Sequence, residues 1–174
     1  MADPLSFSLS AVAFVVLPMY VANATAMLLR GTSLLDFNTK LSDKQPLFGK
    51  GKTIKGTVGG IVSAGVFGFL AAQLFPLQSA MFGISYVQFS FLAGLGAILG
   101  DIAASFVKRR LGFPPGHEIW LLDQLDFLAG GIAFCAAFYF PSAMEIAFLV
   151  ALTLVMHRVS NFVAFKAKLK QVPW

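Results

Sequence analysis

Charged residues are scarce in this sequence. Its 174 residues include 13 Lys and Arg and 8 Asp and Glu, or 12% of the chain, whereas a soluble domain usually carries about 25%. The chain therefore lacks the polar side chains needed to cover a water-facing surface. Cysteine and histidine are also rare, with one Cys and two His. A single cysteine excludes an internal disulfide, and no set of His and Cys at ligand spacing indicates zinc.

Two uncharged runs are long enough to cross a bilayer. Residues 5–29 and 56–100 contain no Asp, Glu, Lys or Arg, and a transmembrane helix needs about 20 apolar residues. The second run is too long for one helix, and Pro76 marks a turn inside it. We therefore predict an all-α integral membrane protein, a single transmembrane domain of about five helices. The predicted helices span residues 5–29, 57–76, 87–107, 119–140 and 143–165, with cytoplasmic loops at 30–56 and 108–118.

The positive charges gather on one side of this predicted bundle. All 13 Lys and Arg residues fall in the two loops, or near and after the end of the fifth helix. Because basic residues favour the cytoplasmic face, we predict an outside N-terminus, a cytoplasmic C-terminus and a place in the cell membrane. Topology and attraction to anionic membrane lipids account for the net charge of +5, so no nucleic-acid partner is expected.

Small residues recur four positions apart in the predicted helices. Gly56 and Gly60 form one such pair, and Gly96 and Gly100 form another. This spacing allows helix backbones to approach closely. It is compatible with a compact bundle and with a homodimer, and it does not decide between them.

Three carboxylates lie inside or beside apolar segments. Asp101 falls in the third predicted helix, and Asp123 and Asp126 fall near the start of the fourth. An ionised Asp at membrane depth costs about 2.5–3.5 kcal/mol even on a lenient scale, and a helix dipole recovers only about 0.3–1 kcal/mol. In a purely structural interpretation, Asp101 pairs with Lys108 or with a neighbouring helix. A divalent cation held by all three carboxylates is favoured, with Mg²⁺ preferred if phosphates complete its shell.

Basic residues in two stretches could face phosphate. Ser105 and Lys108 follow Asp101 by four and seven residues, so all three share one helical face. The segment FGKGKTIKGTVGG, residues 48–60, places glycines and lysines ahead of a helix, an arrangement typical of anion-binding sites. A basic loop that serves topology alone would also explain this second stretch.

Several motif elements occur in a fixed order along the chain. Residues 100–109 read G-D-x-x-x-S-x-x-K-R, followed by P-G-H at 115–117 and D-x-x-D at 123–126. This order resembles the signature of the membrane-bound CDP-diacylglycerol synthases. Upstream, Lys52, Thr53 and Gly56 match the K-K-T-x-E-G element of that family. The departures are a missing K-D-x-G segment, Glu118-Ile119 in place of Gly-Gly, and Gln124 in place of the Arg in D-R-x-D.

The departures and the short chain resemble the archaeal branch of this superfamily, the CDP-archaeol synthases. That resemblance implies CTP as the nucleotide, Mg²⁺ as the cofactor and an isoprenoid glycerol phosphate lipid as the acceptor. The expected reaction transfers CMP from CTP to digeranylgeranylglyceryl phosphate and releases pyrophosphate. The resemblance implies metal binding and catalysis by Asp101, Asp123 and Asp126, a catalytic role for Lys108, and substrate binding by Lys52, Thr53, Ser105, Arg109 and His117. Lys55 joins the substrate-binding set because of the charge of the 48–60 loop.

Three other functions would share parts of this sequence pattern or its charge distribution. A CDP-diacylglycerol synthase acting on phosphatidic acid would carry the same motif. A CDP-alcohol phosphotransferase would need a D-G-x-x-A-R motif, which is absent. A small cation transporter or channel subunit would use the carboxylates as an ion path, and it predicts polar residues that continue toward the outer face. The second and third predicted helices have few such residues.

Overall fold

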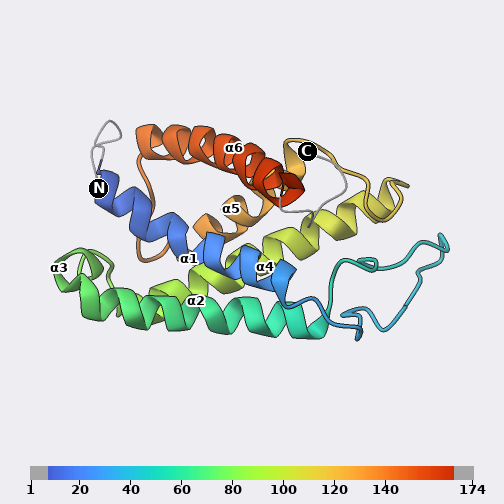
Figure 1. Ribbon diagram of the computed structural model, residues 1–174, viewed down its shortest axis with the longest axis horizontal. Coiled ribbons are helices and arrows are strands. Elements are labelled where there is room, and N and C mark those ends of the chain that lie inside the picture. Colours follow the sequence, from blue (N-terminus) through green and yellow to red (C-terminus); the bar gives the residue numbers. More distant parts are fainter. Residues whose placement is uncertain (1–7, 167–174) are drawn as a thin grey trace. The chain divides into compact units, whose positions relative to one another are not determined.

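The computed structural model describes residues 8–166, and its regular elements are six helices (Figure 1). The chain divides into two compact units. One unit, Leu9–Phe140, contains the first five helices, and the other contains the sixth. The helices are α1 (Leu9–Leu28), α2 (Ile54–Leu74), α3 (Pro76–Ser79), α4 (Tyr86–Arg110), α5 (Leu122–Cys135) and α6 (Ala143–Lys166).

Three of these helices, α1, α2 and α4, are long and apolar enough to cross a membrane. A shorter apolar stretch, Ala143–Met156, lies in α6. These findings confirm the predicted all-α membrane protein. Helices α1, α2, α4, α5 and α6 overlap the five predicted ranges, although α5 covers only part of its range, and the expected turn at Pro76 contains the short α3. The predicted start of the first helix at residues 5–7 lies outside the described residues, and the orientation stays a prediction.

Helix α4 is the central helix of the first unit. It packs against α1, α2 and α5, and α1 also packs against α2. Close approach depends on glycine: a Cβ atom on Gly60 would lie 2.7 Å from the Ala22 carbonyl oxygen, and one on Gly56 would lie 2.6 Å from that of Ala26. The small residues of α2 are therefore used within the chain, in its contact with α1. A homodimer stays a prediction.

Helices α4 and α5 cross with their backbones in contact. A Cβ atom on Gly96 would lie 2.5 Å from the Gly130 carbonyl oxygen, and one on Gly100 would overlap the Asp126 carbonyl oxygen. The G-D element of α4 and the D-x-x-D element of α5 therefore meet directly. This crossing fixes the backbone of Asp101 beside that of Asp126.

Helix α5 is shorter than predicted at both ends. Its 14 residues span about 21 Å, less than the roughly 30 Å of a bilayer core. The chain before it forms a turn in which the Asp123 carboxylate accepts a hydrogen bond from the Ile119 N–H, at 3.0 Å. After it, the Phe138 and Tyr139 N–H groups donate to the Cys135 carbonyl. Asp123 consequently lies in the first turn of α5, instead of one to two turns inside a helix that begins near residue 119.

The second unit is built on α6, whose start is capped by two side chains. The Ser142 N–H donates to the Glu145 carboxylate at 2.9 Å, and the Glu145 N–H donates to Ser142 Oγ at 3.2 Å. This reciprocal pair is a capping box. It gives the buried Glu145 a structural role at the start of the helix.

Candidate functional site

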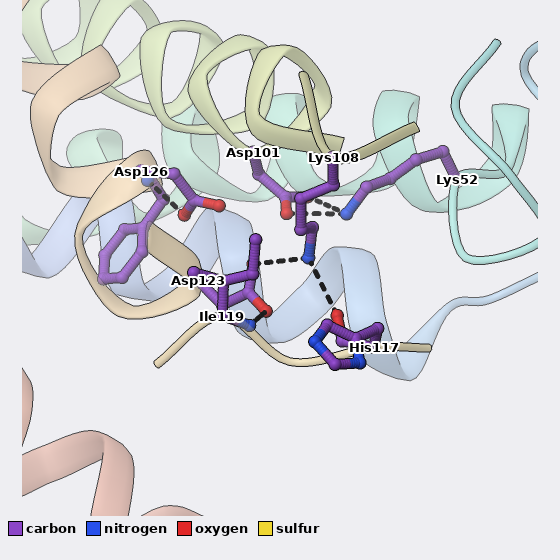
Figure 2. Close-up of polar contacts among 8 residues, drawn as sticks. Lys52, Asp101, Lys108, His117, Ile119, Asp123 and Asp126 are labelled. Atoms are coloured by element: carbon purple, nitrogen blue, oxygen red, sulfur yellow. Dashed lines mark hydrogen bonds and ion pairs between the residues drawn. The ribbon is translucent and has the colours of Figure 1, made fainter. Parts of the chain in front are cut away.

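Two lysine–carboxylate pairs form the centre of the site (Figure 2). Lys52 Nζ lies 2.6 and 2.5 Å from the two carboxylate oxygens of Asp101. Lys108 Nζ lies 2.5 Å from Asp123 Oδ1 and 3.4 Å from the His117 carbonyl oxygen. The four side chains are mostly buried. The fold thus brings the 48–60 segment, the end of α4 and the start of α5 to one place.

Asp126 adds a third carboxylate to this group. It lies one turn after Asp123 on α5, and Figure 2 shows its carboxylate directed toward Asp101. Its Oδ1 accepts a hydrogen bond from the Phe127 N–H at 2.6 Å. Asp126 is within electrostatic range of Asp101, Asp123 and Lys52. The three carboxylates predicted from the sequence therefore share one region.

A cavity of about 200 Å³ opens beside these pairs. Its walls come from α1, the segment before α2, and helices α2, α4 and α5, so it lies within the first unit. It is lined by Asn23, Ala26, Met27, Arg30, Gly51, Lys52, Thr53, Gly56, Thr57, Ile98, Asp101, Ile102 and Asp123. Polar walls next to apolar ones suit a ligand that carries both kinds of group.

The backbone of Lys52 is fixed by pairing with the segment that follows α1. The Leu35 N–H donates to the Lys52 carbonyl at 2.9 Å, and the Ile54 N–H donates to the Ser33 carbonyl at 3.0 Å. Thr53 lies between these bonds and caps α2. Its Oγ1 accepts hydrogen bonds from the Gly56 and Gly31 N–H groups, at 3.2 and 3.3 Å. Thr53 therefore lines the cavity while its oxygen holds two backbone donors.

Asp36 organises the same loop, a role that no sequence pattern indicates. Its carboxylate accepts hydrogen bonds from the N–H groups of Phe48, Gly49 and Asn38 at 3.0–3.1 Å, and the residue is buried. Burial acts to raise the pKa of Asp36, but these backbone donors outweigh burial and set the pKa below its ordinary value of 3.8. Asp36 is therefore held as a carboxylate that ties residues 48–49 to the start of the loop.

We predict that Asp36→Asn destabilises the protein in a pH-dependent way. A carboxyl whose folded pKa is lowered stabilises the fold above its unfolded pKa, and this stabilisation is lost as pH falls through the folded pKa. The melting temperature at pH 7 should drop by about 2–8 °C, because the charged acceptor of three backbone N–H groups is replaced by a weaker, neutral one. The gap to the wild type should narrow below about pH 4. Thermal unfolding in detergent across this range measures it, with the exposed Asp43→Asn as control; a gap that is independent of pH would contradict the prediction.

The other predicted substrate-binding residues differ in their positions. Arg109 is buried near the site: its side chain approaches Gly49, it is within electrostatic range of Asp123, and its Nε and Nη1 have no hydrogen-bond partner among the described residues. Ser105 is buried on α4, between Asp101 and Lys108. The buried, unpaired nitrogens of Arg109 are available to an anion.

Two predicted residues lie at the edge of the site or away from it. Lys55 is exposed in the first turn of α2, where its side chain lies beside Gly31, and it does not line the cavity. The exposed His117 ring stacks on Phe113, with ring centroids 4.8 Å apart. His117 reaches the centre of the site through its carbonyl, which accepts the bond from Lys108.

The carboxylates fit a divalent cation in their chemistry, although they do not form a closed cage. Among residues 8–166 no group of three or more His, Cys, Asp and Glu side chains is arranged to hold a metal ion. Lysine ammonium groups instead face the oxygens of Asp101 and Asp123. Mg²⁺ is usually bound through one or two carboxylates together with substrate phosphates, and seldom by an all-protein cage. The donor set is therefore suited to a cation that arrives with a phosphate ligand.

Comparison with known proteins gives one consistent family. Residues 6–174 match the family described as CarS-like, CDP-archaeol synthase. The chain is 37% identical to the CDP-archaeol synthase of Pyrococcus abyssi, over 91% of this chain and 94% of that protein. It is 39% identical to the CDP-archaeol synthase of Methanopyrus kandleri, over 91% and 90%. A solved structure of an intramembrane enzyme for archaeal membrane lipid biosynthesis matches with a TM-score of 0.78 at 35% identity, covering 86% of this chain and 91% of that one.

Proposed function

The chain belongs to the CDP-archaeol synthase family, and on that premise we propose how its residues transfer CMP from CTP to an ether-lipid phosphate. It is a CTP-dependent nucleotidyltransferase of archaeal lipid biosynthesis. The proposed site rests on one observation: three carboxylates and two lysines lie close together beside one cavity. We assign CTP and an isoprenoid glycerol phosphate lipid to this cavity, with CDP-archaeol and pyrophosphate as products.

The reaction joins two anions, so neutralising charge is the main requirement. A phosphate monoester has its second pKa near 6, so the acceptor oxygen is already ionised at neutral pH and needs no strong general base. That oxygen attacks the α-phosphorus of CTP in line: a new P–O bond forms, the bond to the β-phosphate breaks, and pyrophosphate leaves with the electron pair. Positive groups around the phosphates stabilise the charge that develops in this step.

Different residues of the site contribute to neutralising the phosphate charges. Lys52 and Lys108 are cations that can turn from carboxylates toward phosphate oxygens, and the buried Arg109 has nitrogens free to donate. Asp101, Asp123 and Asp126 would hold Mg²⁺, which supplies charge neutralisation at the phosphate oxygens. In the first turn of α5, Asp123 is kept in orientation by the hydrogen bond from the Ile119 N–H and by the ion pair with Lys108.

The test is pyrophosphate release by the purified protein in detergent micelles. Release should require CTP, the ether-lipid phosphate and Mg²⁺ together, and EDTA should abolish it until Mg²⁺ is restored. Release without a lipid phosphate would indicate hydrolysis and would contradict the proposal. Full activity in EDTA would remove the metal assignment.

The choice of lipid needs a separate comparison. Phosphatidic acid and the ether-lipid phosphate present the same headgroup phosphate, so the site geometry alone treats them alike. We propose that the ether lipid is preferred, and the ratio of kcat/KM for the two lipids tests this.

Liposomes that pass cations without turning over CTP would favour the transporter alternative.

We further propose that the site faces the cytoplasm of a multi-pass protein in the cell membrane. CTP is a soluble nucleotide, and the basic segments that contribute to the site carry the charge typical of a cytoplasmic face. The native Cys135 is buried, so a cysteine at exposed Lys44 can be labelled selectively. Labelling of that position from outside the intact cell would contradict the proposed orientation. A cysteine at exposed Ala80 serves as the control on the opposite side of the membrane.

A further inference from the structure

The wall of the cavity on the α1 side is formed by residues outside the predicted catalytic and substrate-binding set. Asn23, Ala26, Met27 and Arg30 line it from α1 and the residues directly after that helix. Asn23 lies three and four residues before Ala26 and Met27, so these residues share one side of α1. Arg30 follows two residues after Leu28, where the helix ends. The wall thus carries one amide inside the helix and one cation just after it.

Arg30 is a cation that can accept a new anionic partner. Lys52, the other cation that lines the cavity, is already paired with Asp101. Arg30 has no carboxylate partner among residues 8–166, and it is exposed. A phosphate that enters the cavity can therefore pair with Arg30 without breaking an existing ion pair. A guanidinium also matches phosphate with two parallel N–H donors.

Asn23 places a polar group inside an apolar helix. It is half-buried in α1, one of the helices long and apolar enough to span a membrane. Polar side chains in such helices usually face a cavity or the interior of the bundle, because exposure to lipid is costly. Its position in the cavity lining meets this requirement and provides an amide donor more than one turn before the end of α1.

The apolar part of this wall indicates which substrate uses it. Ala26 and Met27 of α1 face the cavity, as do Ile98 and Ile102 of α4. Met27 is 56% exposed and its neighbour Leu28 is 72% exposed, so the α1 side joins the cavity to an apolar outer surface. A nucleotide has no hydrocarbon chain to pack against such a surface, whereas a glycerol phosphate lipid does. Asp101 and Asp123 line the cavity from α4 and α5 and suit the nucleotide with its cation.

We infer that Arg30 and Asn23 bind the phosphate of the acceptor lipid and so determine its affinity. This inference rests on the proposed function and deepens it. The shared ligand chemistry is a phosphate, which either substrate could supply, so the experiment must separate the two sources.

The test compares Michaelis constants for both substrates in Arg30→Ala and Asn23→Leu. Arg30→Ala should raise the KM for the ether-lipid phosphate in mixed micelles by about ten- to a hundredfold, the effect expected from losing a hydrogen bond between charged groups. The KM for CTP should change less than about twofold, and Arg30→Lys should recover part of the loss. Lys40→Ala is the matched control, since it removes an exposed cation of the same loop that does not line the cavity.

Two outcomes would overturn the inference. A raised KM for CTP with an unchanged lipid KM would assign Arg30 to the nucleotide, and unchanged values for both would remove it from the site. Equilibrium binding of the lipid phosphate without CTP gives a second readout, which should weaken in Arg30→Ala and not in Lys40→Ala. If the wild type itself releases no pyrophosphate, the proposed function fails. If the wild type is active and Arg30→Ala matches it, only this inference fails.

Discussion

Asp123→Asn is expected to lower the rate of pyrophosphate release by about a hundred- to a thousandfold, as does the loss of one charge-stabilising group in other active sites. Asp123 Oδ1 pairs with Lys108, and Oδ2 accepts the hydrogen bond from the Ile119 N–H. An amide at this position keeps the shape but loses the charge that balances the lysine and that the proposed cation requires. The rate of pyrophosphate release at saturating CTP and lipid phosphate measures the effect.

The control for this variant is Asp43→Asn. Asp43 is an exposed carboxylate that pairs with Arg110, at 3.1 Å. Exposed ion pairs contribute about 0–1 kcal/mol, so this variant should keep its rate to within about twofold. An Asp123→Asn variant that is folded and as active as Asp43→Asn would remove Asp123 from the site.

Gly100→Ala is expected to lower both activity and stability. The added Cβ would overlap the Asp126 carbonyl oxygen and would lie 3.1 Å from the Gly130 Cα. These are backbone atoms, so α5 must shift as a whole, at a cost of about 1–3 kcal/mol. That shift moves Asp123 and Asp126 away from Asp101, and a displacement near 1 Å can cost about a hundredfold in rate.

Gly65→Ala provides the matched control for this variant. A Cβ atom on Gly65 would make only ordinary contact with Phe91, at 3.6 Å. Since alanine is favoured over glycine inside a helix by up to about 1 kcal/mol, Gly65→Ala should keep or raise the melting temperature and retain activity. Thermal unfolding in detergent and the pyrophosphate assay compare the two variants. Equal behaviour of both would show that the α4–α5 crossing does not position the carboxylates.

Most of the helices can be predicted from the sequence, which also singles out the three carboxylates that the fold brings into one region. Apolar runs with few charges predict α1, α2 and α4 because hydrophobic length is a local property. The extent of α5 could not be predicted in this way. Its start depends on the hydrogen bond from the Ile119 N–H to the Asp123 side chain, and its end on bonds to the Cys135 carbonyl. These contacts span only three or four residues, but they depend on turn and side-chain geometry, which the pattern of apolar residues does not encode.

The partners of the carboxylates depend on tertiary structure. Helical spacing placed Lys108 on the face of Asp101, but seven residues correspond to about 10 Å along the axis. Lys108 instead pairs with Asp123 of α5, and Asp101 pairs with Lys52 from the segment before α2. The sequence does not single out Asp36 or Arg30 for the same reason. Their surroundings form only when the loop after α1 folds back on α2.

The most direct test of the central claim follows the label of α-³²P-CTP into lipid. The protein in micelles with Mg²⁺ and the ether-lipid phosphate should transfer the label to an organic-soluble product, in equal amount to the pyrophosphate released. Asp101→Asn, Asp123→Asn and Asp126→Asn should each lose this transfer, whereas Asp43→Asn should keep it. Label that stays in the aqueous phase with the active wild type, or transfer that survives in all three variants, would contradict the account.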